Sequence, residues 1–264
     1  MVRDPDEQAA LPPLSWETPD GFPPLEAFEV HVWRFGLDAP RDRLDRFEAT
    51  LNVEERARAD RFRGAGLRKK FVAGRGALRS LLGSYLGRDP AEVRFRYGVH
   101  GKPTLEDDPG GLSFNLAHSG EIALCAFSRG RSLGVDVEFA RPLENGAKII
   151  KRFFSESEQT AFHMLPDTDR LKGFYLGWTR KEAFLKATGT GLATRLDSFD
   201  VNLDPSESPR ILRVDESSNG SGTWNIYHLD PLSGYAGALV VAATGRDQRL
   251  VIRLWDALSG ESIF

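Results

Sequence analysis

Two carboxylates alternate with valines in the middle of the chain. In Leu-Gly-Val-Asp-Val-Glu, residues 133–138, Asp136 and Glu138 are two positions apart and follow Val135 and Val137. Because alternate side chains of a strand point to one face, the carboxylates share a face and the valines turn to the core. Oxygen ligands of this kind suit Mg²⁺, which commonly bridges a substrate phosphate. Taken alone, the pattern also fits two solvated acids on an exposed strand edge.

A second set of polar residues repeats at helical spacing further along the chain. Trp178, Glu182 and Lys186 are four positions apart, so they share one face of a helix predicted over 169–188. One interpretation is an ordinary surface ion pair between Glu182 and Lys186, worth about 0.2–0.5 kcal/mol. The other makes Glu182 a third metal ligand or a base and places Lys186 on a phosphate oxygen. Neither motif is decisive alone, but together they specify a magnesium–phosphate reaction centre.

The charge of the chain is unevenly distributed. Its 264 residues carry 35 Lys and Arg against 38 Asp and Glu, a net charge of -3. Residues 53–82 alone carry +6, which leaves -9 for the remainder. The basic segment is either a solvated helical face or a cradle for a polyanionic ligand. A nucleic-acid-binding protein is the opposing interpretation and is disfavoured: the acids at 136, 138 and 182 would repel a phosphate backbone unless Mg²⁺ intervened, and no nucleic-acid-binding motif accompanies the cations.

Composition excludes several further classes of protein. With 41% hydrophobic and 28% charged residues the chain is globular. No apolar run approaches the roughly 20 residues of a membrane helix, and the start lacks a signal-peptide pattern. A single cysteine, Cys125, excludes a disulfide framework and a cysteine-based zinc site, and it reads as a small core residue. We therefore expect a cytoplasmic protein without a membrane partner.

Periodicity predicts the elements that position these residues in the first half. Residues 1–26 are rich in proline and predict an extended tail. Three helices are expected: one from Pro40, one from Asn52 with Glu55 as a capping box, and one that ends at Gly87. Residues 98–111 are expected to form a loop. The predicted strands cover 28–35, 93–97, 112–116, 122–127 and 133–139.

The second half of the chain shows the same kinds of helix and strand signals. Ser155 and Glu158 form a capping box that opens a helix, and Gly189 ends the later helix over 169–188. The inward stripe of that longer helix is predicted to be Leu171, Phe174, Tyr175 and Trp178. The predicted strands cover 199–203, 211–214, 224–229, 235–243 and 250–254. Each half would then hold helices on one side of an antiparallel sheet, which makes the fold class α+β.

Four signatures occur in an order that resembles the 4'-phosphopantetheinyl transferase superfamily, Sfp type. They are Gly-Lys-Pro-Thr-Leu at 101–105, Phe-Asn-Leu-Ala-His-Ser-Gly at 114–120, Gly-Val-Asp-Val-Glu at 134–138, and Trp-Thr-Arg-Lys-Glu-Ala-Phe-Leu-Lys at 178–186. Ser-Phe-Asp at 198–200 also fits, and the resemblance spans about 54–203.

This resemblance implies a monomer of two pseudo-symmetric α+β halves with antiparallel sheets and the active site at their interface. The implied division is a tail over 1–26, a half over 27–131 that binds coenzyme A phosphates, and a half over 132–264 that holds the magnesium site and transfer residues.

The implied reaction is the Mg²⁺-dependent transfer of the 4'-phosphopantetheine arm of coenzyme A to a serine of an apo acyl or peptidyl carrier protein. It releases 3',5'-ADP and is a holo-acyl-carrier-protein synthase activity, of the kind that serves polyketide, nonribosomal peptide or siderophore assembly. By resemblance, Asp136, Glu138 and Glu182 bind the magnesium, and Lys186 contacts the transferred phosphate. The base that deprotonates the serine is either Glu182 or a water on the metal.

The resemblance also implies a coenzyme A site. Lys102 and His118 match positions that hold the 3'-phosphate, and Pro103 and Ser119 complete this part of the site. Ala117 stands where the family usually has serine, so the pocket is expected to rely more on backbone amides or arginines. Two further phosphate contacts are predicted within the basic segment, where nine cations crowd together: Arg58 and Arg75.

Overall fold

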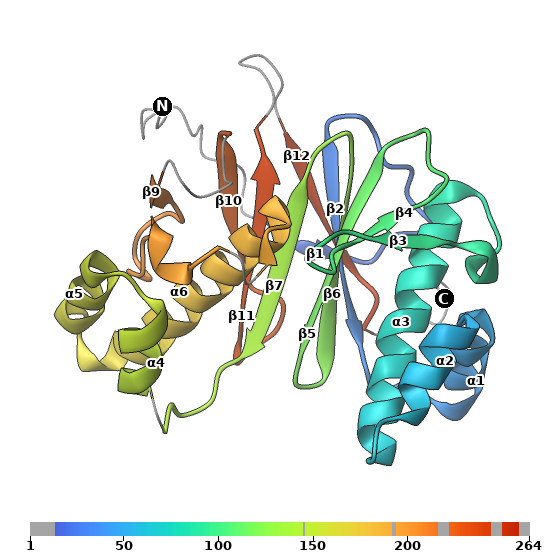
Figure 1. Ribbon diagram of the computed structural model, residues 1–264, viewed down its shortest axis with the longest axis horizontal. Helices are drawn as coiled ribbons and strands as arrows, with labels where there is room; N and C mark the ends of the chain where they lie inside the picture. The colour runs from blue at the N-terminus through green and yellow to red at the C-terminus, as the bar shows by residue number, and fades with distance from the viewer. Residues whose placement is uncertain (1–13, 145, 192–193, 216–221, 244–249, 259–264) are drawn as a thin grey trace.

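The computed structural model describes residues 14–144, 146–191, 194–215, 222–243 and 250–258. Two sheets occupy the middle of the molecule, with one group of helices on either side (Figure 1). The α+β class predicted from the sequence is confirmed. Among the described residues, no helix has both the length and the apolar character needed to cross a membrane.

The first group of helices lies beside the larger sheet (Figure 1). It comprises α1 (Arg41–Thr50), α2 (Val53–Asp60) and α3 (Ala65–Leu86). The predicted capping box opens α2, with the Asn52 side chain accepting from the Glu55 amide and the Glu55 side chain accepting from the Asn52 amide. Gly87 ends α3 in the left-handed conformation, at a φ of 63°. The local signals that predicted these helices therefore place their ends correctly.

The larger sheet has the order β1-β12-β2-β6-β5. Its strands are β1 (Trp16–Glu17), β12 (Val251–Asp256), β2 (Glu29–Gly36), β6 (Ile122–Arg129) and β5 (Leu112–Ser119). The pairs β2–β6 and β5–β6 are antiparallel, as predicted, whereas β12 runs parallel to both β1 and β2. The last described strand thus belongs to the sheet of the first half, whereas the predicted division at residue 132 assigns it to the second half.

The smaller sheet is antiparallel and has the order β10-β11-β7. Its strands are β10 (Trp224–Leu229), β11 (Tyr235–Ala242) and β7 (Leu133–Phe139). The long helix α6 (Asp167–Thr188) packs against it, and α4 (Gly146–Phe153) and α5 (Glu156–Met164) lie at the far end of α6 (Figure 1). The Val135 amide of β7 donates to Asn115 Oδ1 of β5 at 2.8 Å. The two sheets therefore meet along β5 and β7.

Two short hairpins complete the described fold. The pairs are β3 (Phe95–Tyr97) with β4 (Pro103–Leu105), and β8 (Phe199–Val201) with β9 (Ile211–Val214). The loop predicted over 98–111 is thus partly wrong, because β4 lies within it and pairs antiparallel with β3. Its three residues are too few to give a recognisable alternation of apolar side chains.

Two other predictions change in detail. Residues 1–13 of the predicted tail lie outside the described part of the chain, but the rest of it is packed: Phe22 stacks on Trp33 at 5.6 Å, and Trp16 Nε1 donates to the Asp230 carbonyl at 2.7 Å. Leu171 is 39% exposed, so its place in the inward stripe of α6 is wrong. The buried part of α6 begins at Gly173, which leaves Leu171 in the exposed first turns.

Candidate functional site

The strand β7 and the helix α6 approach each other unusually closely. A Cβ atom on Gly134 would lie 2.2 Å from the Ala183 carbonyl oxygen and 2.3 Å from the Ala187 amide nitrogen. Only glycine therefore allows the last turns of α6 to lie against the start of β7. This contact brings the carboxylates that follow Gly134 on the strand next to the polar face of the helix.

Asp136 is the most buried carboxylate of this contact. Its side chain accepts from Lys186 Nζ through Oδ1 at 2.6 Å, and the residue is 5% exposed. The other oxygen, Oδ2, is buried and has no hydrogen-bond partner among the described residues. Burial raises the pKa of Asp136 to about 7, an effect that Lys186 opposes and the charges of Glu138 and Glu182 reinforce. The site therefore holds a buried carboxylate oxygen with spare acceptor capacity.

Glu138 and Glu182 complete an acidic cluster, which we define as Asp136, Glu138 and Glu182. Burial raises the pKa of Glu182, Lys186 lowers it, and Glu138 raises it further. Lys186 pairs with Asp136 across the β7–α6 contact rather than forming the surface ion pair considered above. The strand and helix motifs thus meet, and the charge of Lys186 acts on both Asp136 and Glu182.

The acidic cluster can be tested for its fit to a divalent cation. Within the described ranges, no three His, Cys, Asp or Glu side chains are already gathered tightly enough to hold a metal ion. Two observations nevertheless fit Mg²⁺: the unpartnered, buried Oδ2 of Asp136, and carboxylates whose mutual repulsion a cation would relieve. Carboxylate oxygen is also the donor that Mg²⁺ prefers.

His118 lies at the end of β5, close to this cluster. The partial burial of its ring lowers its pKa, the cations Lys186 and Lys70 lower it further, and Glu138 raises it. Lys70 approaches from α3, where its Nζ donates to the Gly120 carbonyl at 2.9 Å and pairs with Glu121 at 2.6 Å. Sequence reasoning did not select Lys70, because nothing in its spacing distinguishes it from the other cations of the basic segment.

The residues on either side of His118 have packing partners. Ser119 Oγ donates to Glu138 Oε2 at 2.7 Å and accepts from the Phe139 amide at 3.1 Å. The serine predicted to bind coenzyme A thus links β5 to β7 and orients Glu138. Ala117, the departure from the family pattern, is 4% exposed and packs in the apolar cluster between the sheets. Its methyl group faces away from His118, because neighbouring strand residues point to opposite faces.

Lys102 contacts the backbone of the second half. Its Nζ donates to the carbonyls of Leu133 at 3.0 Å, Lys186 at 2.5 Å and Ala187 at 3.2 Å. Burial lowers the pKa of Lys102 to about 8. The three N–H groups of the ammonium therefore all have protein acceptors. The next residue, Pro103, begins β4 and lies opposite Tyr97 of β3.

The two predicted arginines differ in their surroundings. Arg75 forms an ion pair with Glu55, donates to Tyr97 Oη at 2.8 Å and stacks 4.2 Å from the Phe95 ring centroid. Its guanidinium is thus bound within the first half. Arg58 is exposed on α2 and lies 5.3 Å from the ring centroid of Phe71. Of these two, Arg58 has the side chain that a ligand could reach.

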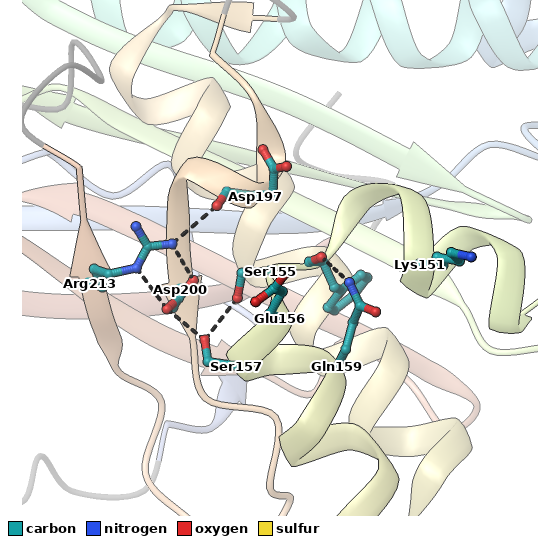
Figure 2. A pocket seen from close by; sticks show the side chains of 9 residues that line it. Lys151, Ser155, Glu156, Ser157, Gln159, Asp197, Asp200 and Arg213 are labelled. Atoms are coloured by element: carbon teal, nitrogen blue, oxygen red, sulfur yellow. Dashed lines mark hydrogen bonds and ion pairs between the residues drawn. The ribbon is translucent and has the colours of Figure 1, made fainter.

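A polar pocket of about 490 Å³ lies elsewhere, and none of the predicted site residues lines it (Figure 2). Asp200 accepts there from Ser157 Oγ at 2.8 Å and from Arg213 Nε at 2.9 Å. Asp200 belongs to the Ser-Phe-Asp signature, and its contacts join α5 to β8 and β9. The residues that line the pocket are Lys151, Phe154, Ser155, Glu156, Ser157, Gln159, Asp197, Asp200 and Arg213. The acid and base at the centre of the pocket, Asp200 and Arg213, neutralise each other.

Comparison with known proteins agrees with this geometry. Residues 132–240 match the family model of the 4'-phosphopantetheinyl transferase superfamily, and residues 39–129 match that of the 4'-phosphopantetheinyl transferase N-terminal region. The 4'-phosphopantetheinyl transferase HetI of Nostoc sp. is 42% identical over 219 residues, covering 82% of this chain and 89% of the relative. The 4'-phosphopantetheinyl transferase Sfp of Bacillus subtilis is 31% identical over 215 residues, covering 81% and 92%. With relatives of this identity matched over nearly their whole length, the chain belongs to the 4'-phosphopantetheinyl transferase superfamily.

Proposed function

We propose that this protein transfers the 4'-phosphopantetheine arm of coenzyme A to a serine of an apo carrier protein and releases 3',5'-ADP. One observation carries the proposal: the buried Asp136, with its unpartnered Oδ2, lies against Lys186 and beside the other acids of the cluster. This combination of acids and a lysine suits a reaction at a phosphoryl group. The superfamily to which the chain belongs indicates that this group is in the phosphoanhydride of coenzyme A.

The acidic cluster is the proposed Mg²⁺ site, with Asp136, Glu138 and Glu182 as protein ligands. When bound, Mg²⁺ supplies positive charge that offsets the negative charge developing on the leaving phosphate. Ser119 orients Glu138 for this task through its 2.7 Å hydrogen bond. Lys186 provides the second positive charge, and its contact with Asp136 keeps the ammonium at the edge of the cluster.

Glu182 is the proposed base. Its carboxylate lies in the acidic cluster, close enough to Asp136 to affect the pKa of that residue, and it can take the serine proton directly or through a water. In the reaction the serine oxygen bonds to the phosphorus that carries the pantetheine arm, and the phosphoanhydride P–O bond breaks. The serine proton passes to Glu182, and 3',5'-ADP leaves with the electron pair of the broken bond.

The nucleotide phosphates are proposed to bind near His118. Lys186 and Lys70 both lower the pKa of the ring, so positive charge at this position favours a bound anion. Without substrate, each cation is paired with a carboxylate, Lys186 with Asp136 and Lys70 with Glu121. This supports the proposed division of labour, in which residues 27–131 bind coenzyme A and residues 132–264 hold the metal and transfer residues. The strand β12 is the exception, since it belongs to the larger sheet.

The transfer itself can be tested by intact-protein mass spectrometry. The purified protein is incubated with coenzyme A, Mg²⁺ and a panel of apo acyl, peptidyl and aryl carrier domains. We expect a mass gain of one phosphopantetheine group on at least one carrier, and none on the same carrier with its acceptor serine replaced by alanine. A gain on an acyl carrier would establish the holo-acyl-carrier-protein synthase activity. No gain on any carrier would refute the proposed function.

A further inference from the structure

Lys102 connects the two halves of the molecule at the end of α6. It precedes β4 in the first half, yet its Nζ reaches Leu133 at the start of β7 and the last turn of α6. The carbonyls of Lys186 and Ala187 are among the last four of α6, which have no partner within the helix. A cation at this end also interacts favourably with the helix dipole. Lys102 therefore supplies the α6 terminus with both hydrogen bonds and positive charge.

The same contact acts on the transfer lysine. Lys102 holds the main-chain oxygen of Lys186 at 2.5 Å, while Asp136 holds its side-chain ammonium at 2.6 Å. The stem of Lys102 also packs beside Gly189, where a Cβ atom would lie 3.3 Å from its Cδ. These contacts fix the last turn of α6 relative to β7. Lys186 is thus held at its backbone from one half and at its side chain from the other.

From these contacts we infer that Lys102 is a positioning residue that sets Lys186 and the end of α6 against β7, and that it does not bind the 3'-phosphate of coenzyme A. Each N–H of its ammonium already has a backbone acceptor, so phosphate binding would require contacts to α6 or β7 to break. The inference rests on the proposed function, and it differs from the role that the family resemblance implies. Of the two residues that the resemblance assigns to the 3'-phosphate, His118 is then the one that remains.

Removal of the phosphate from the substrate distinguishes the two roles. The kcat and KM of the wild-type protein, Lys102→Met and His118→Ala are measured with coenzyme A and with 3'-dephospho-coenzyme A. For Lys102→Met we expect kcat to fall by about a hundredfold with both substrates, because Lys186 is displaced. The ratio of kcat/KM for coenzyme A to kcat/KM for 3'-dephospho-coenzyme A should stay within about twofold of the wild-type ratio. For His118→Ala the ratio should fall about tenfold, because one charge-assisted contact is lost.

Two results would overturn the inference: a Lys102→Met ratio that falls as it does for His118→Ala, or an unchanged kcat in Lys102→Met. If the methionine variant does not fold, Lys102→Gln, which keeps amide donors for the carbonyls, is measured in the same way. The double variant Lys102→Met/Lys186→Ala gives an independent readout. Because Lys102 acts through Lys186, the Lys102→Met change should lower kcat by less than about threefold when Lys186 is already alanine. An inactive wild-type protein would instead refute the proposed function.

Discussion

Two aspartates with nearly the same burial lie in opposite electrostatic surroundings. Asp136 of the acidic cluster is 5% exposed, and Asp200 of the polar pocket is 6% exposed. Burial raises the pKa of both, but at Asp200 hydrogen bonds from Arg213, Ser155 and Ser157 outweigh it and the net pKa is lowered. At Asp136, burial and the charges of Glu138 and Glu182 raise the pKa, and Lys186 alone lowers it. The net pKa is therefore raised, to about 7.

This difference separates a carboxylate whose partners are all within the protein from one that can accept a ligand. Asp200 has partners for both oxygens, since Ser157 and Arg213 bind Oδ2 and Arg213 also binds Oδ1. Asp136 keeps a buried oxygen without a protein partner in the described part of the chain. A fold tolerates such an arrangement where a ligand completes it, because an unpaired buried polar atom is otherwise a net cost.

The largest expected difference between the two aspartates is in activity. Asp136→Asn should lower kcat of the transfer reaction by at least about a hundredfold, because a ligand of the proposed metal site is lost. Asp200→Asn, the matched control, should keep the kcat of the wild type within about threefold per folded molecule. The mass-spectrometric assay measures both rates. An equal loss of kcat in the two variants would show that the two aspartates do not differ in their role in the transfer.

Stability should show the reverse order. Asp200→Asn should lower the free energy of unfolding at pH 7 by about 1–3 kcal/mol, because charge-assisted hydrogen bonds from Arg213 are lost. Since the folded pKa of Asp200 lies below its usual value, its contribution is present above about pH 4 and disappears as the pH falls through the folded pKa. Asp136→Asn should leave the protein as stable as the wild type, or more so. Urea unfolding of the wild type and the two variants at pH 7 and pH 3 tests this order. If Asp200→Asn lowers the free energy of unfolding as much at pH 3 as at pH 7, the prediction is wrong.

The smallest expected effect is that of the metal on thermal unfolding. At ten times its dissociation constant, Mg²⁺ should stabilise the wild-type protein by about 1.4 kcal/mol and raise its melting temperature. The increase should persist in Asp200→Asn and vanish in Asp136→Asn, because only the second variant changes the proposed ligands. Differential scanning fluorimetry without coenzyme A isolates binding from turnover. A full increase in Asp136→Asn would place the metal elsewhere.

The sequence predicted the parts of this site that depend on local periodicity. The alternation at Asp136 and Glu138 and the helical spacing of Glu182 and Lys186 each follow from neighbouring residues. The family signatures then indicated that these two motifs act together. The role inferred for Lys102 could not be predicted in this way, because its acceptors lie 31, 84 and 85 positions away and are backbone carbonyls. Backbone acceptors leave no trace in residue type.

The same limit applies to the sheet. Alternation predicted a strand close to Val251–Asp256, but not its partner, because parallel pairing between distant segments has no local signal. Lys70 was not predicted as a site residue for a related reason. Its distinction from the neighbouring cations is its position beside the β5–β6 turn, where it donates to the Gly120 carbonyl.

The place of β12 ties the two halves together during folding as well as in the finished structure. Because β12 lies between β1 and β2, the larger sheet cannot be completed until the chain beyond β11 has returned to it. A fragment that ended after β11 would leave the edge of β2 uncovered, and a long, bare strand edge invites pairing between molecules. The half over 27–131 is therefore not a separable module, because its sheet needs a strand from beyond β11.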